Sequence, residues 1–144
     1  MAKKRVRYNE SMKICICCSL SFTDEVLALV EKLETLGHEL LLPNGMINRV
    51  TEQEDFDPVK TKAATDAVRK HIDKIREADA VLVCNYDKKD IKNYIGANTF
   101  IEIAAAHYMH KPIYALNPLP EQSYIKDEIE SFDIAVLNGD LAIL

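Results

Sequence analysis

The 144-residue sequence lacks the marks of several large protein classes. Its four glycines form neither the G-x-G-x-x-G nor the Walker pattern that cradles a dinucleotide or a triphosphate. No apolar run approaches the roughly 18 residues of a membrane span, and no signal-peptide core precedes the first apolar segment. We therefore expect a cytoplasmic protein that makes no membrane contact and uses no cofactor.

The charge balance excludes a further class. The formal net charge is −5, whereas a general nucleic-acid-binding protein would carry a basic surface. We expect no nucleic-acid partner. The 48% hydrophobic and 28% charged residues are normal for a globular domain of this length.

Cysteine is present, but not in a pattern that predicts a metal site or a disulfide. Cys15, Cys17, Cys18 and Cys84 lie in short apolar runs, and none of them forms a Cys-x-x-Cys pair. We expect buried, reduced thiols that behave as small apolar side chains, and no metal site. His107 and His110 fall near a predicted helix end, where a cation suits the helix dipole.

The order of apolar segments predicts the fold. Residues 1–12 are basic without an apolar period, so we expect a flexible tail. Residues 13–144 read as one domain in which strands alternate with amphipathic helices. Residues 44–57 show no period and predict a long loop, followed by a helix that starts near Pro58 with Asp57 as its cap. The predicted strands are 12–18, 38–42, 80–84, 113–116 and 134–137.

Five strands separated by helices predict an α/β fold. We expect a doubly wound, Rossmann- or flavodoxin-like parallel sheet of five strands with helices on both faces. The crossover between the first two strands has the length that a right-handed parallel connection needs. Ligands of such sheets bind beyond the carboxyl ends of the strands.

Residues 94–106 place one charged side chain, Glu102, in an otherwise apolar helix that we expect to start at Asn98 or Thr99. A buried carboxylate costs several kcal/mol (~3–5) unless it is compensated. In one interpretation Thr99 is the N-cap and Glu102 closes a capping box. In the other, Glu102 faces a pocket and takes part in chemistry.

Three segments should converge with Glu102 at the carboxyl edge of the sheet. The first segment follows the first strand, the second follows the third strand, and the third leads into the helix that carries Glu102. Ser19 can be either a cap or a ligand contact, and Gly96 permits a positive φ or a close backbone approach. The candidate substrate-binding residues are Ser19, Leu20, Phe22, Asn85, Asp87, Gly96, Asn98 and Thr99.

A family resemblance rests on residues from three of these segments. They are Asp79-Ala80-Val81-Leu82-Val83, Gly96-Ala97-Asn98-Thr99-x-x-Glu102-Ile103-x-x-Ala106 and Lys111-Pro112-Ile113. This pattern resembles the nucleoside 2-deoxyribosyltransferase superfamily, which includes the 2′-deoxynucleoside 5′-phosphate N-hydrolases. The resemblance implies that Glu102 is the nucleophile that attacks the anomeric carbon, that the substrate is a nucleoside or nucleotide, and that the protein is a homodimer or a higher homo-oligomer.

The sequence also departs from that family pattern. Gly96 stands where the family has an acid or a serine, Cys15 falls near the family's first-strand tyrosine, and His71 occupies the position of an aspartate. These departures keep open a non-catalytic nucleotide-binding or sensing module of the same fold. A looser similarity of 96–102 to cytokinin-activating phosphoribohydrolases of the lysine-decarboxylase-like fold gives a further alternative.

Overall fold

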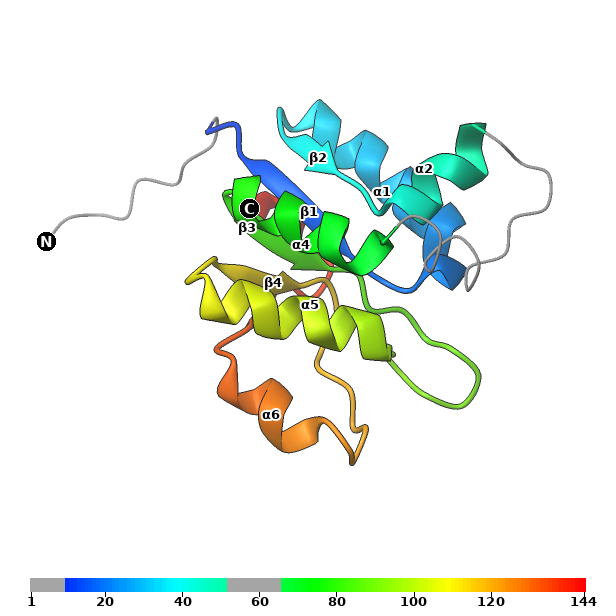
Figure 1. The fold of residues 1–144 in the computed structure, drawn as a ribbon, viewed down its shortest axis with the longest axis vertical. Coiled ribbons are helices and arrows are strands. Elements are labelled where there is room, and N and C mark those ends of the chain that lie inside the picture. Colours follow the sequence, from blue (N-terminus) through cyan, green and yellow to red (C-terminus); the bar gives the residue numbers. More distant parts are fainter. Residues whose placement is uncertain (1–9, 52–65) are drawn as a thin grey trace, which may run out of the picture.

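The sheet confirms the predicted fold class. A computed structural model describes residues 10–51 and 66–144. Its five strands are all parallel and lie in the order β2-β1-β3-β4-β5, with β1 between β2 and β3 (Figure 1). The strands are β1 (Lys13–Cys17), β2 (Glu39–Leu41), β3 (Ala80–Val83), β4 (Ile113–Ala115) and β5 (Ala135–Val136). The order reverses between β1 and β3, which is where ligands of such sheets bind.

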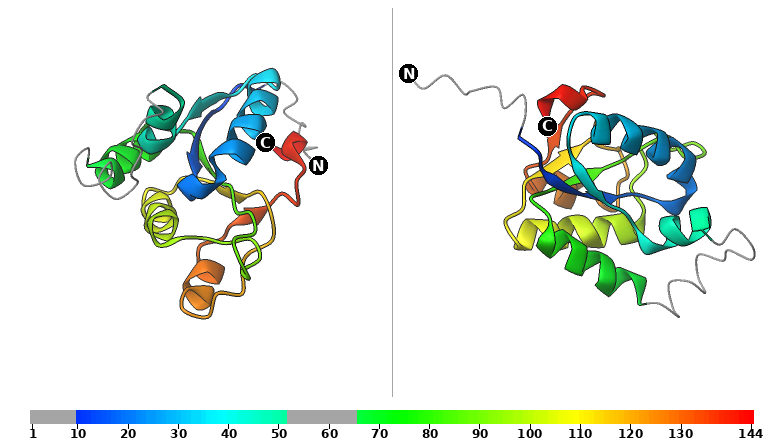
Figure 2. Two further views of the ribbon diagram at one scale, coloured as in Figure 1. Left: turned by 90° about the vertical axis from the view of Figure 1, so that its right-hand side faces the viewer. Right: turned by 90° about the horizontal axis from the view of Figure 1, so that it is seen from above.

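Helices cover both faces of the sheet (Figure 2). The side of β1 that carries Ile14 and Ile16 packs against α1, and the side that carries Cys15 and Cys17 packs against α4 and α5. The helices are α1 (Thr23–Thr35), α2 (Asn44–Thr51), α4 (Ala67–Glu77), α5 (Ala97–Tyr108) and α6 (Lys126–Ser131), with short 3-10 turns η1 (Leu20–Phe22) and η2 (Leu141–Ile143).

The start of β1 is tied to its neighbours by side chains as well as by the sheet. The backbone N–H of Lys13 donates to Oδ2 of Asp79 at 2.8 Å, and the N–H of Met12 donates to Nδ1 of His38 at 3.2 Å. These bonds come from the residues just before β3 and β2, the two strands that flank β1. They fix where β1 begins relative to these two neighbours.

Helix ends follow the local chemistry of the sequence. Gly37, two residues after the end of α1, adopts φ +96, and its N–H donates to the carbonyl of Glu34. This left-handed conformation is easily reached by glycine and explains the stop. His107 lies in the last turn of α5, as predicted, and its ring packs 5.0 Å from that of Phe132.

The predicted loop at residues 44–57 is wrong in its first part, because residues Asn44–Thr51 form α2. Lys74 of α4 explains the position of this helix, since its ammonium group donates to the carbonyl of Leu42 and to Oδ1 of Asn44. The predicted cap and start of the next helix, Asp57 and Pro58, lie outside the described residues, as do residues 1–9 of the predicted tail. Within the described ranges, no helix is both long and apolar enough to cross a membrane.

Candidate active site

Glu102 is buried in the second turn of α5, with 7% of its surface exposed. The helix begins at Ala97, earlier than predicted, because Gly96 takes the N-cap position. The N–H of Phe100 donates to the Gly96 carbonyl at 2.9 Å, which closes the first turn. Thr99 therefore lies inside the helix, 2% exposed, and the capping box predicted with Thr99 as N-cap is wrong.

Glu102 lies in a buried polar cluster built from three elements. Cys15 and Cys17 come from β1, His71 comes from the middle of α4, and Glu102 comes from α5. Nε2 of His71 lies 3.4 Å from Sγ of Cys15, 3.5 Å from Sγ of Cys17 and 3.8 Å from Oε2 of Glu102. Cys15 and Cys17 share one face of β1 because successive strand residues point to opposite faces. We call these four residues the thiol–imidazole–carboxylate cluster.

The charges of this cluster are mutually dependent. The hydrogen bond with Cys17, together with the bond and the charge of His71, lowers the pKa of the Cys15 thiol to about 6, although burial opposes the shift. Burial opposes a charge on His71, but the hydrogen bond to Cys15 and the charges of Glu102 and Cys15 outweigh it and raise the pKa of the imidazole. Burial raises the pKa of the Cys17 thiol, and its hydrogen bond with Cys15 acts in the same direction. The arrangement favours a thiolate on Cys15 beside a protonated His71.

Two of the three departures from the family pattern belong to the thiol–imidazole–carboxylate cluster, and His71 is the one shown beside Glu102. Cys15 and His71 stand where the resemblance expects a tyrosine and an aspartate, and both contact the cluster. The sequence prediction of buried, reduced thiols holds for all four cysteines. It missed that two of them gather around a histidine. The available signal was the one-residue spacing of Cys15 and Cys17, which places both thiols on one side of a strand.

Asn85 lies at the predicted edge but uses its amide within the protein. It is fully buried, and its Nδ2 donates to the carbonyls of Asn117 and Pro118, each at 3.0 Å. Its Oδ1 accepts from the N–H of Asn117 at 3.0 Å, and its carbonyl accepts from Nδ2 of Asn117 at 2.9 Å. These bonds clamp the segment after β3 to the segment after β4.

The candidates after β1 are also engaged locally. Oγ of Ser19 caps η1 by accepting from the N–H of Ser21 at 3.3 Å, so the cap interpretation is confirmed. Leu20 packs against the core on the α1 side. Phe22 is buried there, with its ring 5.4 Å from that of Tyr86 in an edge-to-face arrangement. Leu20 and Phe22 therefore belong to the α1 side of the molecule, whereas the thiol–imidazole–carboxylate cluster lies on the other side of β1.

The remaining candidates flank the entrance to α5. Oδ1 of Asp87 accepts from the N–H of Asn93 at 2.9 Å and so shapes the exposed loop before α5. Asn98 is half-buried in the first turn. Gly96 has φ −80, so the expected positive φ is absent, and a Cβ there would lie 3.2 Å from the hydroxyl of Tyr94. The group that lies close to the Gly96 backbone is therefore the side chain of Tyr94.

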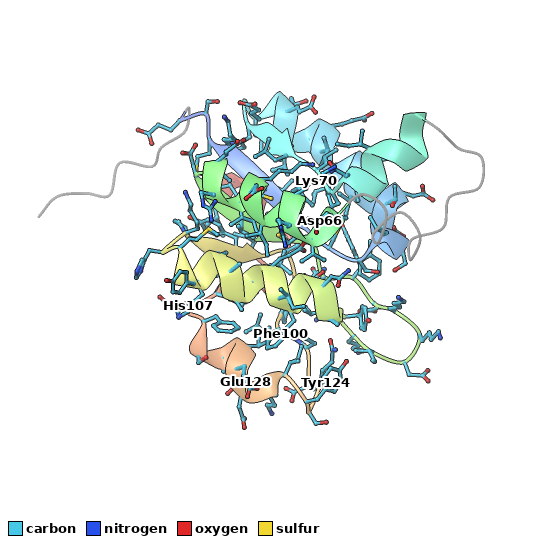
Figure 3. All side chains as sticks on the ribbon, viewed as in Figure 1. Asp66, Lys70, Phe100, His107, Tyr124 and Glu128 are labelled. Carbon is cyan, nitrogen blue, oxygen red and sulfur yellow. The ribbon has the colours of Figure 1, made fainter. Side chains whose placement is uncertain are left out.

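The outer side of α5 is a packing surface. Figure 3 labels Phe100 and His107 along the edge of α5 that faces α6. The ring of Phe132, just after α6, lies 6.0 Å from that of Phe100 and 5.0 Å from that of His107. Within the described residues the polar cluster thus occupies one side of α5, and aromatic packing occupies another.

Comparison with known proteins gives structural relatives. No family model and no curated protein matches the sequence. A 2-deoxyribosyltransferase from Bacillus psychrosaccharolyticus is 22% identical over 80% of each chain, with a TM-score of 0.55. The CMP N-glycosidase BcmB from Clostridium botulinum is 18% identical over 88% of this chain and 89% of its own, with a TM-score of 0.50. The chain shares the fold of these two enzymes, which is the fold that the sequence resemblance implied.

Proposed function

We propose that this protein cleaves or transfers the N-glycosidic bond of a nucleoside or nucleotide, with Glu102 as the nucleophile. The observation that carries the proposal is the position of Glu102, a buried carboxylate beside the carboxyl half of β1 in a fold shared with a deoxyribosyltransferase and an N-glycosidase. In doubly wound sheets this edge is the usual place for a ligand.

The chemistry needs one carboxylate and two steps. An oxygen of Glu102 attacks the anomeric carbon, the bond from that carbon to the base nitrogen breaks, and the base leaves with the electron pair and takes up a proton. The glycosyl ester is then opened by water, which gives hydrolysis, or by a second base, which gives transfer. His71, with Nε2 3.8 Å from Oε2 of Glu102, supplies a positive charge that compensates the buried anion.

In this proposal the substrate lies between the segments that follow β1 and β3 and the first turn of α5. Among the predicted binding residues, Ser19, Asp87 and Asn98 are the polar side chains that remain at least partly exposed. We propose that they contact the sugar or the base. Asn85 would act through the clamp that holds the loop after β3.

The test is the release of free base, followed by chromatography, from a panel of 2′-deoxynucleosides and their 5′-monophosphates. A second base added in excess separates transfer from hydrolysis. We expect Glu102→Gln to keep the fold and to bind ligand while turnover falls at least about 1,000-fold, because an amide cannot form the ester. Glu77→Gln, at the exposed end of α4, is the matched control and should retain turnover.

Two results would contradict the proposal. Wild-type turnover by Glu102→Gln would exclude the nucleophile. Nucleotide binding without base release by the wild type would favour the non-catalytic binding module. Mass spectrometry of the intact protein adds an independent readout, because a trapped intermediate adds the mass of one sugar to Glu102.

A further inference from the structure

Three metal-binding atoms converge between β1 and α4. Within the described residues, Sγ of Cys15, Sγ of Cys17 and Nε2 of His71 all lie within 4.8 Å of one another, and all three side chains are buried. We infer that Cys15, Cys17 and His71 form a binding site for Zn²⁺, with the Glu102 carboxylate beside the fourth coordination position.

The distances fit a tetrahedral zinc ion. With Zn–S of about 2.3 Å and Zn–N of about 2.0–2.1 Å, tetrahedral geometry places sulfur and nitrogen about 3.5 Å apart. Nε2 of His71 lies 3.4 Å from Sγ of Cys15 and 3.5 Å from Sγ of Cys17. The donor atoms therefore need little movement to surround an ion.

One nitrogen of the cluster is shared by several neighbouring groups. A single nitrogen, Nε2 of His71, faces two thiols and a carboxylate, but one N–H donates one good hydrogen bond. The other ring nitrogen, Nδ1, is buried and has no hydrogen-bond partner within the described part of the chain. A cation at the centre of the cluster contacts both sulfurs and Nε2 at the same time, which a proton cannot do.

The donor set selects the metal class. Two soft thiolates and one imidazole favour Zn²⁺ over Mg²⁺ or Ca²⁺, which prefer oxygen. The two thiols give up their protons to solvent when the ion binds. The lowered pKa of Cys15 reduces the cost of that step for one thiol. Three protein ligands leave a fourth position, and Oε2 of Glu102 lies 3.8 Å from Nε2 of His71.

A consequence for activity follows, and it rests on the proposed function. A zinc ion beside Glu102 neutralises the carboxylate that would attack the sugar. We expect Zn²⁺ to slow base release and a chelator to restore it. Metal binding itself needs no substrate, so it is tested separately from turnover.

The experiment titrates Co²⁺, a spectroscopic substitute for Zn²⁺, into the full-length, reduced, chelator-treated protein. We expect thiolate-to-cobalt absorption in the near ultraviolet and tetrahedral bands in the visible, saturating at one equivalent and abolished by one equivalent of Zn²⁺. Cys17→Ser and His71→Asn should weaken the binding of Co²⁺ at least about 100-fold, beyond the loss typical of outer-sphere partners. Cys84→Ser, which removes a buried thiol outside the cluster, should leave the spectrum unchanged.

Circular dichroism of each apo variant separates loss of the site from loss of the fold. A wild-type protein that shows no thiolate–cobalt absorption would overturn the proposal, as would a Cys17→Ser variant that is folded and binds Co²⁺ as tightly as the wild type. If Co²⁺ binds as expected while no nucleotide is turned over, the zinc site stands and the proposed function fails. If nucleotide is turned over and no metal binds, the reverse holds.

Discussion

The two faces of β1 carry different kinds of side chain, because successive residues of the five-residue strand point to opposite faces. Ile14 and Ile16 point to α1, where they are fully buried among apolar side chains. Cys15 and Cys17 point to α4 and α5, are equally buried, and contact His71, which lies beside Glu102. One face therefore contributes mainly to stability, and the other holds the polar atoms that chemistry or a metal requires.

The difference shows why burial alone does not separate core from site. All four strand residues have an exposure of 0%. What distinguishes the faces is the helix opposite each of them: α1 brings Val26, Val30 and Leu33, whereas α4 brings His71. A polar group on the facing helix converts an apolar-looking strand into part of a site.

The largest expected effect tests the stabilising face. Ile16→Ala should reduce the free energy of unfolding by about 2–5 kcal/mol, because it removes buried methyl groups and leaves a cavity. Cys17→Ala, its neighbour on the other face, should cost only about 1 kcal/mol in metal-free protein, since one sulfur atom is lost. Urea unfolding with an unchanged m-value measures both. Equal losses would mean that both faces serve packing alike.

A smaller effect tests whether Asn85 belongs to the structure or to the ligand site. Asn85→Ala should lower the free energy of unfolding by about 1–3 kcal/mol, because it leaves buried groups of Asn117 and Pro118 without their partner. Asn98→Ala, in the first turn of α5, is the control and should change it by less than about 0.5 kcal/mol. Unchanged stability with a raised KM for Asn85→Ala would assign the residue to substrate instead.

The smallest effect is a pH response from the α1 side. Burial raises the pKa of Tyr86, which packs against Phe22. The unfolded chain ionises this tyrosine near pH 10, while the folded chain keeps it neutral. Stability from this group is therefore complete below about pH 10 and is lost as the pH rises further.

Thermal unfolding from pH 8 to 11 measures that loss. The Tm of Tyr86→Phe should fall less steeply than that of the wild type. Tyr108→Phe, at a side chain 84% exposed, should retain the wild-type slope. A wild-type slope in Tyr86→Phe would show that ionisation of Tyr86 is not coupled to folding.

Much of the fold could be predicted because its signals are local. The continuous apolar run at Ala80–Val83 and the glycine stop at Gly37 each report on a few neighbouring residues. The prediction failed at α2, whose stretch Asn44–Thr51 contains asparagine, glycine and β-branched residues that disfavour helix. A bond from Lys74, 30 residues away, helps to hold its first turn.

The site was only partly predictable, for the opposite reason. Glu102 could be selected because a single carboxylate in an apolar helix needs an explanation. Thr99 offers a better capping side chain than Gly96, yet the helix starts after Gly96, so the local signal misled. Cys15 and His71 are 56 positions apart in the sequence, and they come into contact only because α4 packs against β1.

The bonds at the start of β1 have a consequence for folding. Isoleucine and cysteine are both apolar enough to be buried, so the hydrophobic effect distinguishes poorly between the two possible facings of this strand. A shift of one residue would turn the thiols toward α1 and the isoleucines toward His71 and Glu102. The bonds that the N–H groups of Lys13 and Met12 donate to Asp79 and His38 select the register that hydrophobicity leaves open. Two polar contacts at the start of β1 thus help to decide whether thiols or isoleucines face His71 and Glu102.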